Sequence, residues 1–163
     1  MKAKPARISV TREALRMRAQ ADRMLSALGV TRNRTDIVGQ LAELIVSGSL
    51  HGTRVSAVQA GYDVMTPTGL RVEVKGRLAD EGARRLTVLL RNLDRSPRPF
   101  DALVYVQFRP DYELEVGRMF DFELVRELAH RVRDGWRMDM SDDVLARGDD
   151  LTGDLGQTLK DLP

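Results

Sequence analysis

The sequence predicts an α/β sandwich built on a mixed β-sheet, and the order of elements along its 163 residues indicates this fold class. Two helical segments come first, over residues 11–29 and 35–48. A β-hairpin over residues 61–77 and three further strands follow, and a helix comes next. At this length, one domain with its own core is the simplest organisation.

Composition argues against several classes of protein. The chain has no cysteine, which excludes disulfides and thiolate metal sites and fits a cytoplasmic protein. No apolar run is long enough for a transmembrane helix or a secretory signal, so we expect no membrane partner. The two histidines lie far apart, which disfavours a histidine zinc site. Glycine-rich phosphate loops and Gly-x-Ser-x-Gly elbows are also absent from the sequence.

Charge is distributed unevenly along the chain. Residues 1–34 contain nine Lys or Arg against two acidic residues, whereas residues 134–163 contain eight Asp against three basic residues. The basic arm can contact phosphate groups, or it can be an ordinary solvated helix face. We therefore predict a basic N-terminal arm and helix over 1–34, a core over 35–148 and an acidic flexible tail over 149–163.

The first helix is predicted to begin near Thr11, after a disordered stretch over 1–8, and to end at Gly29. Its partial apolar stripe consists of Leu15, Met24, Leu25 and Leu28, with arginines around it. Such a helix can be a lid on the core, a DNA-facing helix or a dimerisation helix. We favour the lid.

The second helix begins at Thr35–Asp36 and is apolar over most of its circumference, so we expect it to be well buried. Glu43 is its one acidic residue beyond the first turn, and no basic residue lies three or four positions away. A buried carboxylate without a partner is costly. Glu43 therefore either points out of a gap in the packing or meets a cation.

The hairpin brings acidic residues together. Its strand formers are Tyr62, Val64, Val72 and Val74, and Pro67-Thr68-Gly69 supplies the turn. With Gly69 at the left-handed position of a three-residue loop, Asp63 lies opposite Glu73. Because side chains alternate along a strand, Lys75 shares the face of Glu73 and Asp63. Two carboxylates across a strand pair repel each other, and a divalent cation such as magnesium removes that repulsion.

The remaining elements follow in order. Residues 50–59 link the second helix to the hairpin, either with a strand over 54–58 or as a loop. We predict strands over 86–90, 102–108 and 112–119, a helix over 122–133, a short edge strand over 136–140 and a short helix from Ser141. The apolar run over 102–108 indicates a central strand buried on both faces. Asp101, just before it, is expected to be structural.

Asp63, the hairpin and Glu73-x-Lys75 together resemble the active-site signature of the PD-(D/E)xK superfamily, the restriction-endonuclease-like nucleases. Gly39-Gln40-Leu41-Ala42-Glu43 resembles the Gly-x-x-x-Glu helix that begins many of these enzymes. Gly61-Tyr62 replaces the nominal proline of the family, and Gln40 stands where one subset has a further glutamate. The resemblance covers about residues 35–130.

The resemblance implies a three-layer αβα sandwich with a central mixed β-sheet, in which the hairpin lies centrally. It implies a metal-dependent nuclease acting on DNA, with Mg²⁺ or Mn²⁺ held by Asp63, Glu73 and Glu43. The catalytic lysine, which positions and polarises the attacking water, would be Lys75. Family members often place basic residues that face the phosphate backbone just after this lysine, and the candidates here are Arg77, Arg84 and Arg85. A homodimer, or a larger protein partner that selects the target, is also expected.

Two other functions stay open on the sequence. The chain can be a catalytically inactive nucleic-acid-binding or regulatory module on the same fold. It can also be an interaction or oligomerisation protein in which Glu-x-Lys occurs by chance. For an active nuclease, the motif does not distinguish endonuclease from exonuclease action.

Overall fold

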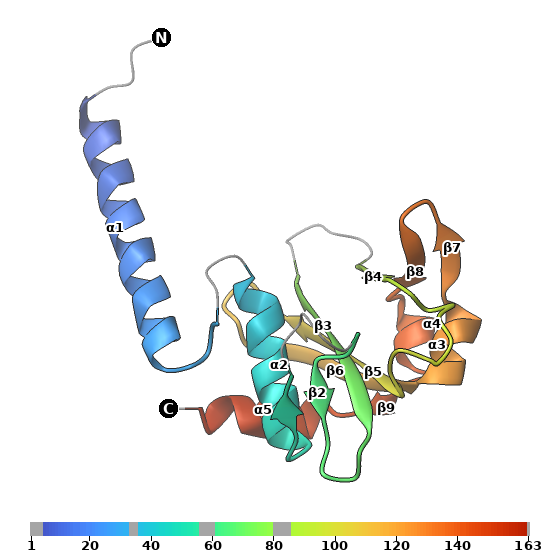
Figure 1. Ribbon diagram of the computed structural model, residues 1–163. Coiled ribbons are helices and arrows are strands. Elements are labelled where there is room, and N and C mark those ends of the chain that lie inside the picture. Colours follow the sequence, from blue (N-terminus) through green and yellow to red (C-terminus); the bar gives the residue numbers. More distant parts are fainter. Residues whose placement is uncertain (1–4, 33–35, 56–60, 80–85, 163) are drawn as a thin grey trace.

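The computed structural model describes residues 5–32, 36–55, 61–79 and 86–162 of the chain. Within these ranges, a six-stranded mixed sheet and a three-stranded antiparallel sheet form with five helices (Figure 1). The predicted α/β class with a central mixed sheet is confirmed. The described part of the chain contains no helix that combines the length and apolar character needed to cross a membrane.

The helices are α1 (Pro5–Ala27), α2 (Ile37–Ser49), α3 (Phe122–Leu128), α4 (Asp142–Leu145) and α5 (Thr152–Lys160). The large sheet has the spatial order β1 (Thr53–Arg54), β2 (Val64–Met65), β3 (Arg71–Leu78), β5 (Ala102–Phe108), β6 (Leu114–Asp121) and β9 (Asp149–Asp150). The small sheet has the order β4 (Thr87–Leu90), β8 (Gly135–Asp139) and β7 (His130–Val132). β3 and β5 are parallel, and the other neighbouring strands are antiparallel.

The large sheet lies between two core clusters, which makes three layers. On one face, α2 and α5 pack against the cluster that contains Ile45, Val74 and Leu155. On the other face, α3 and the small sheet enclose the cluster that contains Tyr105 and Phe120. The third layer therefore combines a helix with a sheet, where the sequence predicted a helix alone.

α2 is buried as its apolar pattern predicts. The Asp36 side chain caps it by accepting the Gly39 N–H at 2.8 Å. The helix approaches β3 closely at Gly76, where a Cβ atom would lie 2.7 Å from the Val38 carbonyl oxygen. A Cβ atom at Gly39 would instead meet the Asp36 side chain. The close approach of α2 to β3 therefore depends on Gly76 of the strand and not on Gly39 of the helix.

The helix predicted over 122–133 is wrong in its second half. α3 ends at Leu128 because Ala129 adopts an extended backbone, and His130–Val132 turn back against β8 as β7. The strand expected at an edge around 136–140 is the central strand of the small sheet, between β4 and β7. Arg133 and Asp134 form the turn, and Val132 pairs with Gly135, which has φ +143°, directly beyond it.

Both ends of the chain differ from the expectation. The predicted flexible tail is wrong, because Thr152–Lys160 form α5 and Leu155 is fully buried. The disordered stretch over 1–8 is wrong from Pro5 onward, where α1 already begins, while residues 1–4 lie outside the described part. The prediction that the first helix covers the core as a lid is also wrong for most of α1. Leu25 packs on the core, but Leu15 and Met17 are both 64% exposed.

Candidate active site

The β2–β3 hairpin has the register that the sequence predicts. Val64 pairs with Val72, and the Asp63 N–H donates to the Val72 carbonyl at 2.9 Å. Continued by one residue, this register brings Asp63 opposite Glu73. Gly69 closes the three-residue loop at φ +83°, the left-handed conformation expected there.

Asp63 is fixed by the neighbouring strand. Its Oδ2 atom accepts the backbone N–H of Val74 at 2.7 Å. Burial raises the pKa of Asp63 above its ordinary value, although the Val74 N–H and the charges of Lys75 and Arg32 oppose this rise. Glu73 also lowers the pKa of Asp63. The two carboxyl groups therefore face each other across the hairpin.

Glu73 and Lys75 lie on one face of β3, as strand alternation requires. Lys75 Nζ donates to Glu73 Oε1 at 2.5 Å, and the side chains are only 23% and 16% exposed, respectively. Burial raises the pKa of Glu73, the positive charge of Lys75 lowers it, and the negative charges of Asp63 and Glu43 raise it again. The pKa of Glu73 is therefore raised overall, although Lys75 is its direct partner.

Glu43 is held toward this region by Arg32, which lies between α1 and α2. The Arg32 guanidinium donates to Glu43 Oε2 and, at 3.1 Å, to the Val55 carbonyl. Burial raises the pKa of Glu43, and the charge of Asp63 raises it further, whereas Arg32 lowers it. The sequence leaves two alternatives for Glu43: it points out of a gap in the packing, or it meets a cation. The structure shows the second, and the cation is the Arg32 guanidinium.

Arg32 and Gln40 were not identified as site residues from the sequence. Arg32 lies eleven positions from Glu43 and outside α2, so no helical spacing rule connects them. Gln40 is 4% exposed, and its side-chain oxygen accepts the backbone N–H of Arg32. Gln40 thus anchors the segment that supplies the cation.

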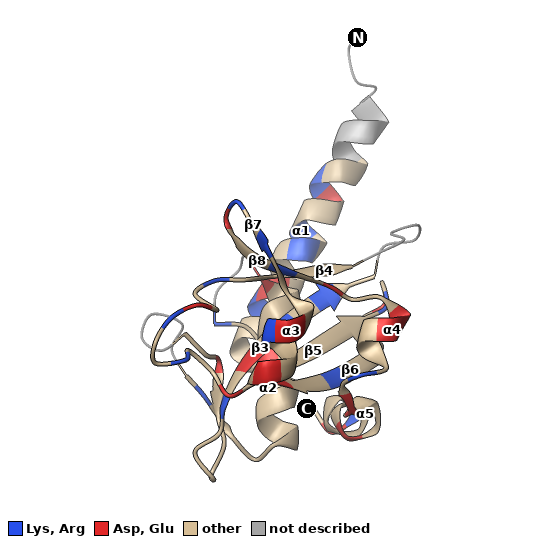
Figure 2. Cartoon of the chain, turned by 90° about the vertical axis from the view of Figure 1, so that its right-hand side faces the viewer, with Lys and Arg blue, Asp and Glu red and all other residues tan. Residues whose placement is uncertain are grey.

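Three carboxyl groups lie in this region, but they do not form a complete ligand set. The charge of Asp63 raises the pKa of Glu43 and of Glu73, and the charge of Glu43 raises the pKa of Glu73 further. The acidic residues of the chain are red in Figure 2. Across the described ranges, no three acidic or histidine side chains are gathered closely enough to hold a metal ion. Asp63 and Glu73 face each other across the hairpin, whereas Glu43 is paired with Arg32. The Asp63–Glu73 pair is therefore the part whose oxygen donors fit a hard divalent cation.

The three arginines predicted to face a phosphate backbone are only partly described by the structure. Arg77 lies on the same face of β3 as Lys75, but its guanidinium donates to the Thr87 carbonyl at 3.0 Å and the Gly76 carbonyl at 2.8 Å. The bond to Thr87 ties β3 to β4. Arg84 and Arg85 lie outside the described residues.

Asp101 has the structural role that the sequence predicts. Its carboxylate accepts hydrogen bonds from the Arg71 side chain at 2.9 and 3.0 Å and from the Arg71 backbone at 2.9 Å. Arg98 lies 2.9 Å away on the same carboxylate. The Arg71 hydrogen bonds lower the pKa of Asp101 to about 2. The network joins the start of β3 to the start of β5.

Known proteins resemble this chain only in structure. No family model and no curated protein matches the sequence. The chain is similar to Hjc, a Holliday junction resolvase of the archaeal hyperthermophile Archaeoglobus fulgidus, at 16% identity and a TM-score of 0.44, over 72% of this chain and 95% of that one. It is also similar to the bacterial homing endonuclease I-Ssp6803I, at 14% identity and a TM-score of 0.38, over 68% of this chain and 80% of that one. Likeness at this level assigns no function.

Proposed function

We propose that this chain is a metal-dependent nuclease of the PD-(D/E)xK type that hydrolyses phosphodiester bonds in DNA. The position of Asp63 opposite Glu73 across the hairpin, with Lys75 bonded to Glu73, is the observation that carries the proposal. Burial raises the pKa of both carboxyl groups, and two half-buried carboxylates facing each other are an unfavourable arrangement for structure alone. The arrangement becomes favourable when a divalent cation shares both groups.

Asp63 and Glu73 would hold Mg²⁺ or Mn²⁺, and Glu43 would contribute as a third acidic group from α2. When bound, the cation lowers the pKa of a coordinated water and stabilises charge developing on the phosphate. The Val74 N–H fixes one oxygen of Asp63, so that the carboxylate is oriented before any ligand arrives. Arg32 holds Glu43 beside the pair and offsets part of its negative charge.

Lys75 would orient the attacking water and stabilise the charged phosphoryl oxygens. Its bond to Glu73 keeps the ammonium group beside the carboxylate pair. In the reaction, the water oxygen forms a bond to phosphorus while the bond from phosphorus to the leaving sugar oxygen breaks. The water loses a proton to solvent, and the leaving oxygen gains one.

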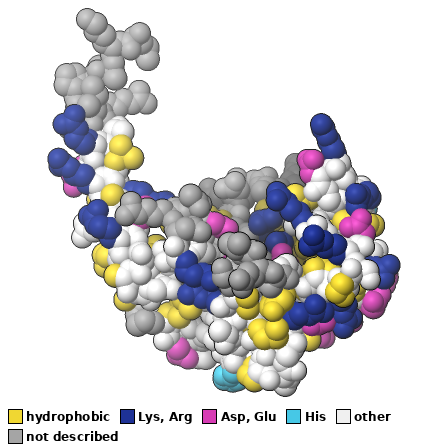
Figure 3. Space-filling model, in the orientation of Figure 1, with side chains coloured by type: hydrophobic (Ala, Val, Ile, Leu, Met, Phe, Trp, Pro, Cys, Tyr) yellow, Lys and Arg dark blue, Asp and Glu magenta, His cyan; other side chains and the backbone are white. Residues whose placement is uncertain are grey.

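The surface supports a polyanionic substrate. Lys and Arg side chains gather on the side of the molecule away from α1 (Figure 3). Exposed arginines in the segment after β4 and in the β7–β8 hairpin are Arg91, Arg95, Arg98, Arg131, Arg133 and Arg137. Basic side chains grouped in this way attract a phosphate backbone without reading its sequence.

Cleavage assays on supercoiled, linear and single-stranded DNA with Mg²⁺ or Mn²⁺ test the proposal. We expect cleavage that chelation abolishes and that Lys75→Met reduces by at least about a hundredfold. Lys160→Met, which removes an exposed lysine at the end of α5, is the matched control and should cleave normally. Absence of cleavage of every form by the folded wild-type chain would contradict the proposal.

The alternative is a catalytically inactive nucleic-acid-binding or regulatory module. It is favoured by the pairing of Glu43 with Arg32 and of Glu73 with Lys75, because each cation already neutralises a carboxylate. This alternative predicts salt-dependent DNA binding without turnover. Under it, Lys75→Met would change binding by no more than the loss of one surface charge.

A further inference from the structure

Helix α1 leaves most of its surface open. It has 23 residues and spans about 35 Å, and its N-terminal end stands clear of the sheets (Figure 1). Val10 is 69% exposed, Met17 64%, Met24 58% and Leu28 50%. Because helices in proteins gain most of their stability by packing an amphipathic face, an open apolar face of this length indicates a missing partner.

The open face has a regular spacing. Six apolar residues, here called the seam, follow one another at alternating intervals of four and three positions: Val10, Ala14, Met17, Ala21, Met24 and Leu28. This is the a/d pattern by which two helices interlock side chains. The arginines Arg12, Arg16 and Arg23 fall at c and f positions, away from the seam. The pattern therefore indicates a second helix as the occupant.

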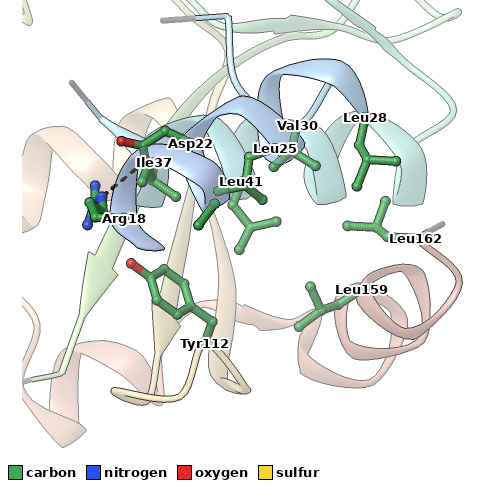
Figure 4. Close-up of a pocket in the computed structure, with 11 residues that line it drawn as sticks. Arg18, Asp22, Leu25, Leu28, Val30, Ile37, Leu41, Tyr112, Leu159 and Leu162 are labelled. Carbon is green, nitrogen blue, oxygen red and sulfur yellow. Dashed lines mark hydrogen bonds and ion pairs between the residues drawn. The ribbon is translucent and has the colours of Figure 1, made fainter. Parts of the chain in front are cut away.

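The seam runs into an apolar groove of about 470 Å³ between α1, α2 and the C-terminal segment (Figure 4). Leu25 and Leu28 form one wall, and Leu41, Tyr112, Leu159 and Leu162 line the rest. Ala21 and Leu28 belong both to the seam and to the groove lining. A helix lying along the seam would therefore cover the groove as well.

We propose that the seam and groove bind α1 of a second copy of this chain, with the two helices antiparallel about a two-fold axis. In that arrangement Val10 faces the partner's Leu28, Ala14 faces the partner's Met24, and Met17 faces the partner's Ala21. Every alanine of the seam then meets a methionine, so large and small side chains alternate across the interface. A parallel pair in register would instead set alanine on alanine and methionine on methionine.

The antiparallel pair is self-complementary, as a two-fold interface requires. The exposed N-terminal half of each α1 lies over the groove of the other copy. Near the axis, Arg18 of each copy approaches its symmetry mate, and Asp22 of the same helix offsets that charge at 3.0 Å. This interface is independent of the proposed nuclease activity, because no seam residue belongs to the candidate active site.

Sedimentation of the full-length chain over about a hundredfold range of concentration tests the interface. We expect a dimer whose dissociation constant Met17→Lys raises by at least about tenfold. Leu15→Lys is the matched control, since Leu15 is also 64% exposed but lies off the seam, and it should leave the dimer intact. A monomer at every concentration, or equal effects of both substitutions, would overturn the proposal.

Disulfide cross-linking tests whether the two α1 helices are antiparallel. Because the chain has no native cysteine, only the introduced cysteines can react. Ala14→Cys mixed with Met24→Cys should form an intermolecular disulfide on oxidation. Neither protein should do so alone, because position 14 and the partner's position 14 would be about 15 Å apart along the axis. Disulfide formation by Ala14→Cys alone, with none gained in the mixture, would overturn the antiparallel arrangement.

Discussion

Asp101 and Glu73 each pair with a basic residue on β3, yet their pKa values move in opposite directions. Asp101 accepts several hydrogen bonds from Arg71 and lies beside Arg98, so its pKa falls to about 2. Burial raises the pKa of Glu73, and its two acidic neighbours add to this rise, while its one lysine partner opposes it. The difference separates an ion pair that stabilises the fold from the charge cluster that we propose binds a cation.

We expect Glu73 and Asp101 to differ most in their effect on catalysis. Glu73→Gln removes the proposed metal ligand but keeps the side-chain shape, and we expect cleavage to fall by at least about a hundredfold. Asp101→Asn should keep the cleavage rate per folded molecule near the wild-type value. Initial rates at saturating Mg²⁺ measure this, with the folded fraction determined by circular dichroism. Equal losses in both variants would remove the distinction.

Stability should show the reverse order. Asp101→Asn weakens a carboxylate with several charge-assisted hydrogen bonds, and we expect the free energy of unfolding to fall by about 2 kcal/mol. The matched control is Asp94→Asn, because Asp94 pairs with Arg131 at 2.9 Å with both side chains more than half exposed. That change should cost much less, because an exposed ion pair contributes little to stability. Urea unfolding of both variants measures the difference.

The ion pair between Arg32 and Glu43 tests how much a charge pair in the candidate active site contributes to stability. Arg32→Met leaves Glu43 half-buried without its cation, so we expect a loss of about 1 kcal/mol in unfolding free energy at neutral pH. Adding Glu43→Gln should restore most of it, because the uncompensated charge is then gone. A double-mutant cycle in urea measures this coupling, and strict additivity would show that the pair contributes nothing.

The pH dependence should differ in sign between the two regions. Asp101 has a folded pKa lowered from 3.8 to about 2, so its stabilisation is complete above about pH 4 and is lost as pH falls toward 2. Asp63 has a raised folded pKa, so its contribution is greatest below its ordinary value and is lost as pH rises through the folded pKa.

Asp63→Asn should therefore be slightly more stable than wild type at neutral pH without metal, and no more stable at pH 3. Asparagine can still accept the Val74 N–H, which makes this variant a test of charge alone. Melting temperatures across pH measure the effect. A variant less stable than wild type at neutral pH would mean that ionised Asp63 stabilises the fold.

The sequence predicted the elements whose signal is local. The hairpin register follows from its turn residues, the burial of α2 from its apolar circumference, and the central position of β5 from its apolar run. The gathering of Asp63, Glu73 and Lys75 follows from strand alternation once the register is known. These predictions needed no knowledge of distant contacts.

The remaining features depend on distant contacts. β1 and β9 have two residues each and exist because they pair with β2 and β6. α5 has an aspartate- and glycine-containing sequence that resembles a tail, and burial of Leu155 is what fixes it. Arg32 reaches Glu43 from another segment, so only the packed chain identifies it. Residues 130–132 were predicted as helix, and their pairing with β8 is what makes them a strand.

The central claim is that Asp63 and Glu73 together hold a divalent cation, and calorimetric titration with Mn²⁺ tests it most directly. We predict saturable binding to the wild-type chain and to Asp101→Asn, and loss of that binding in Asp63→Asn. Indistinguishable titrations of the wild-type chain and Asp63→Asn, with both proteins folded, would contradict the claim.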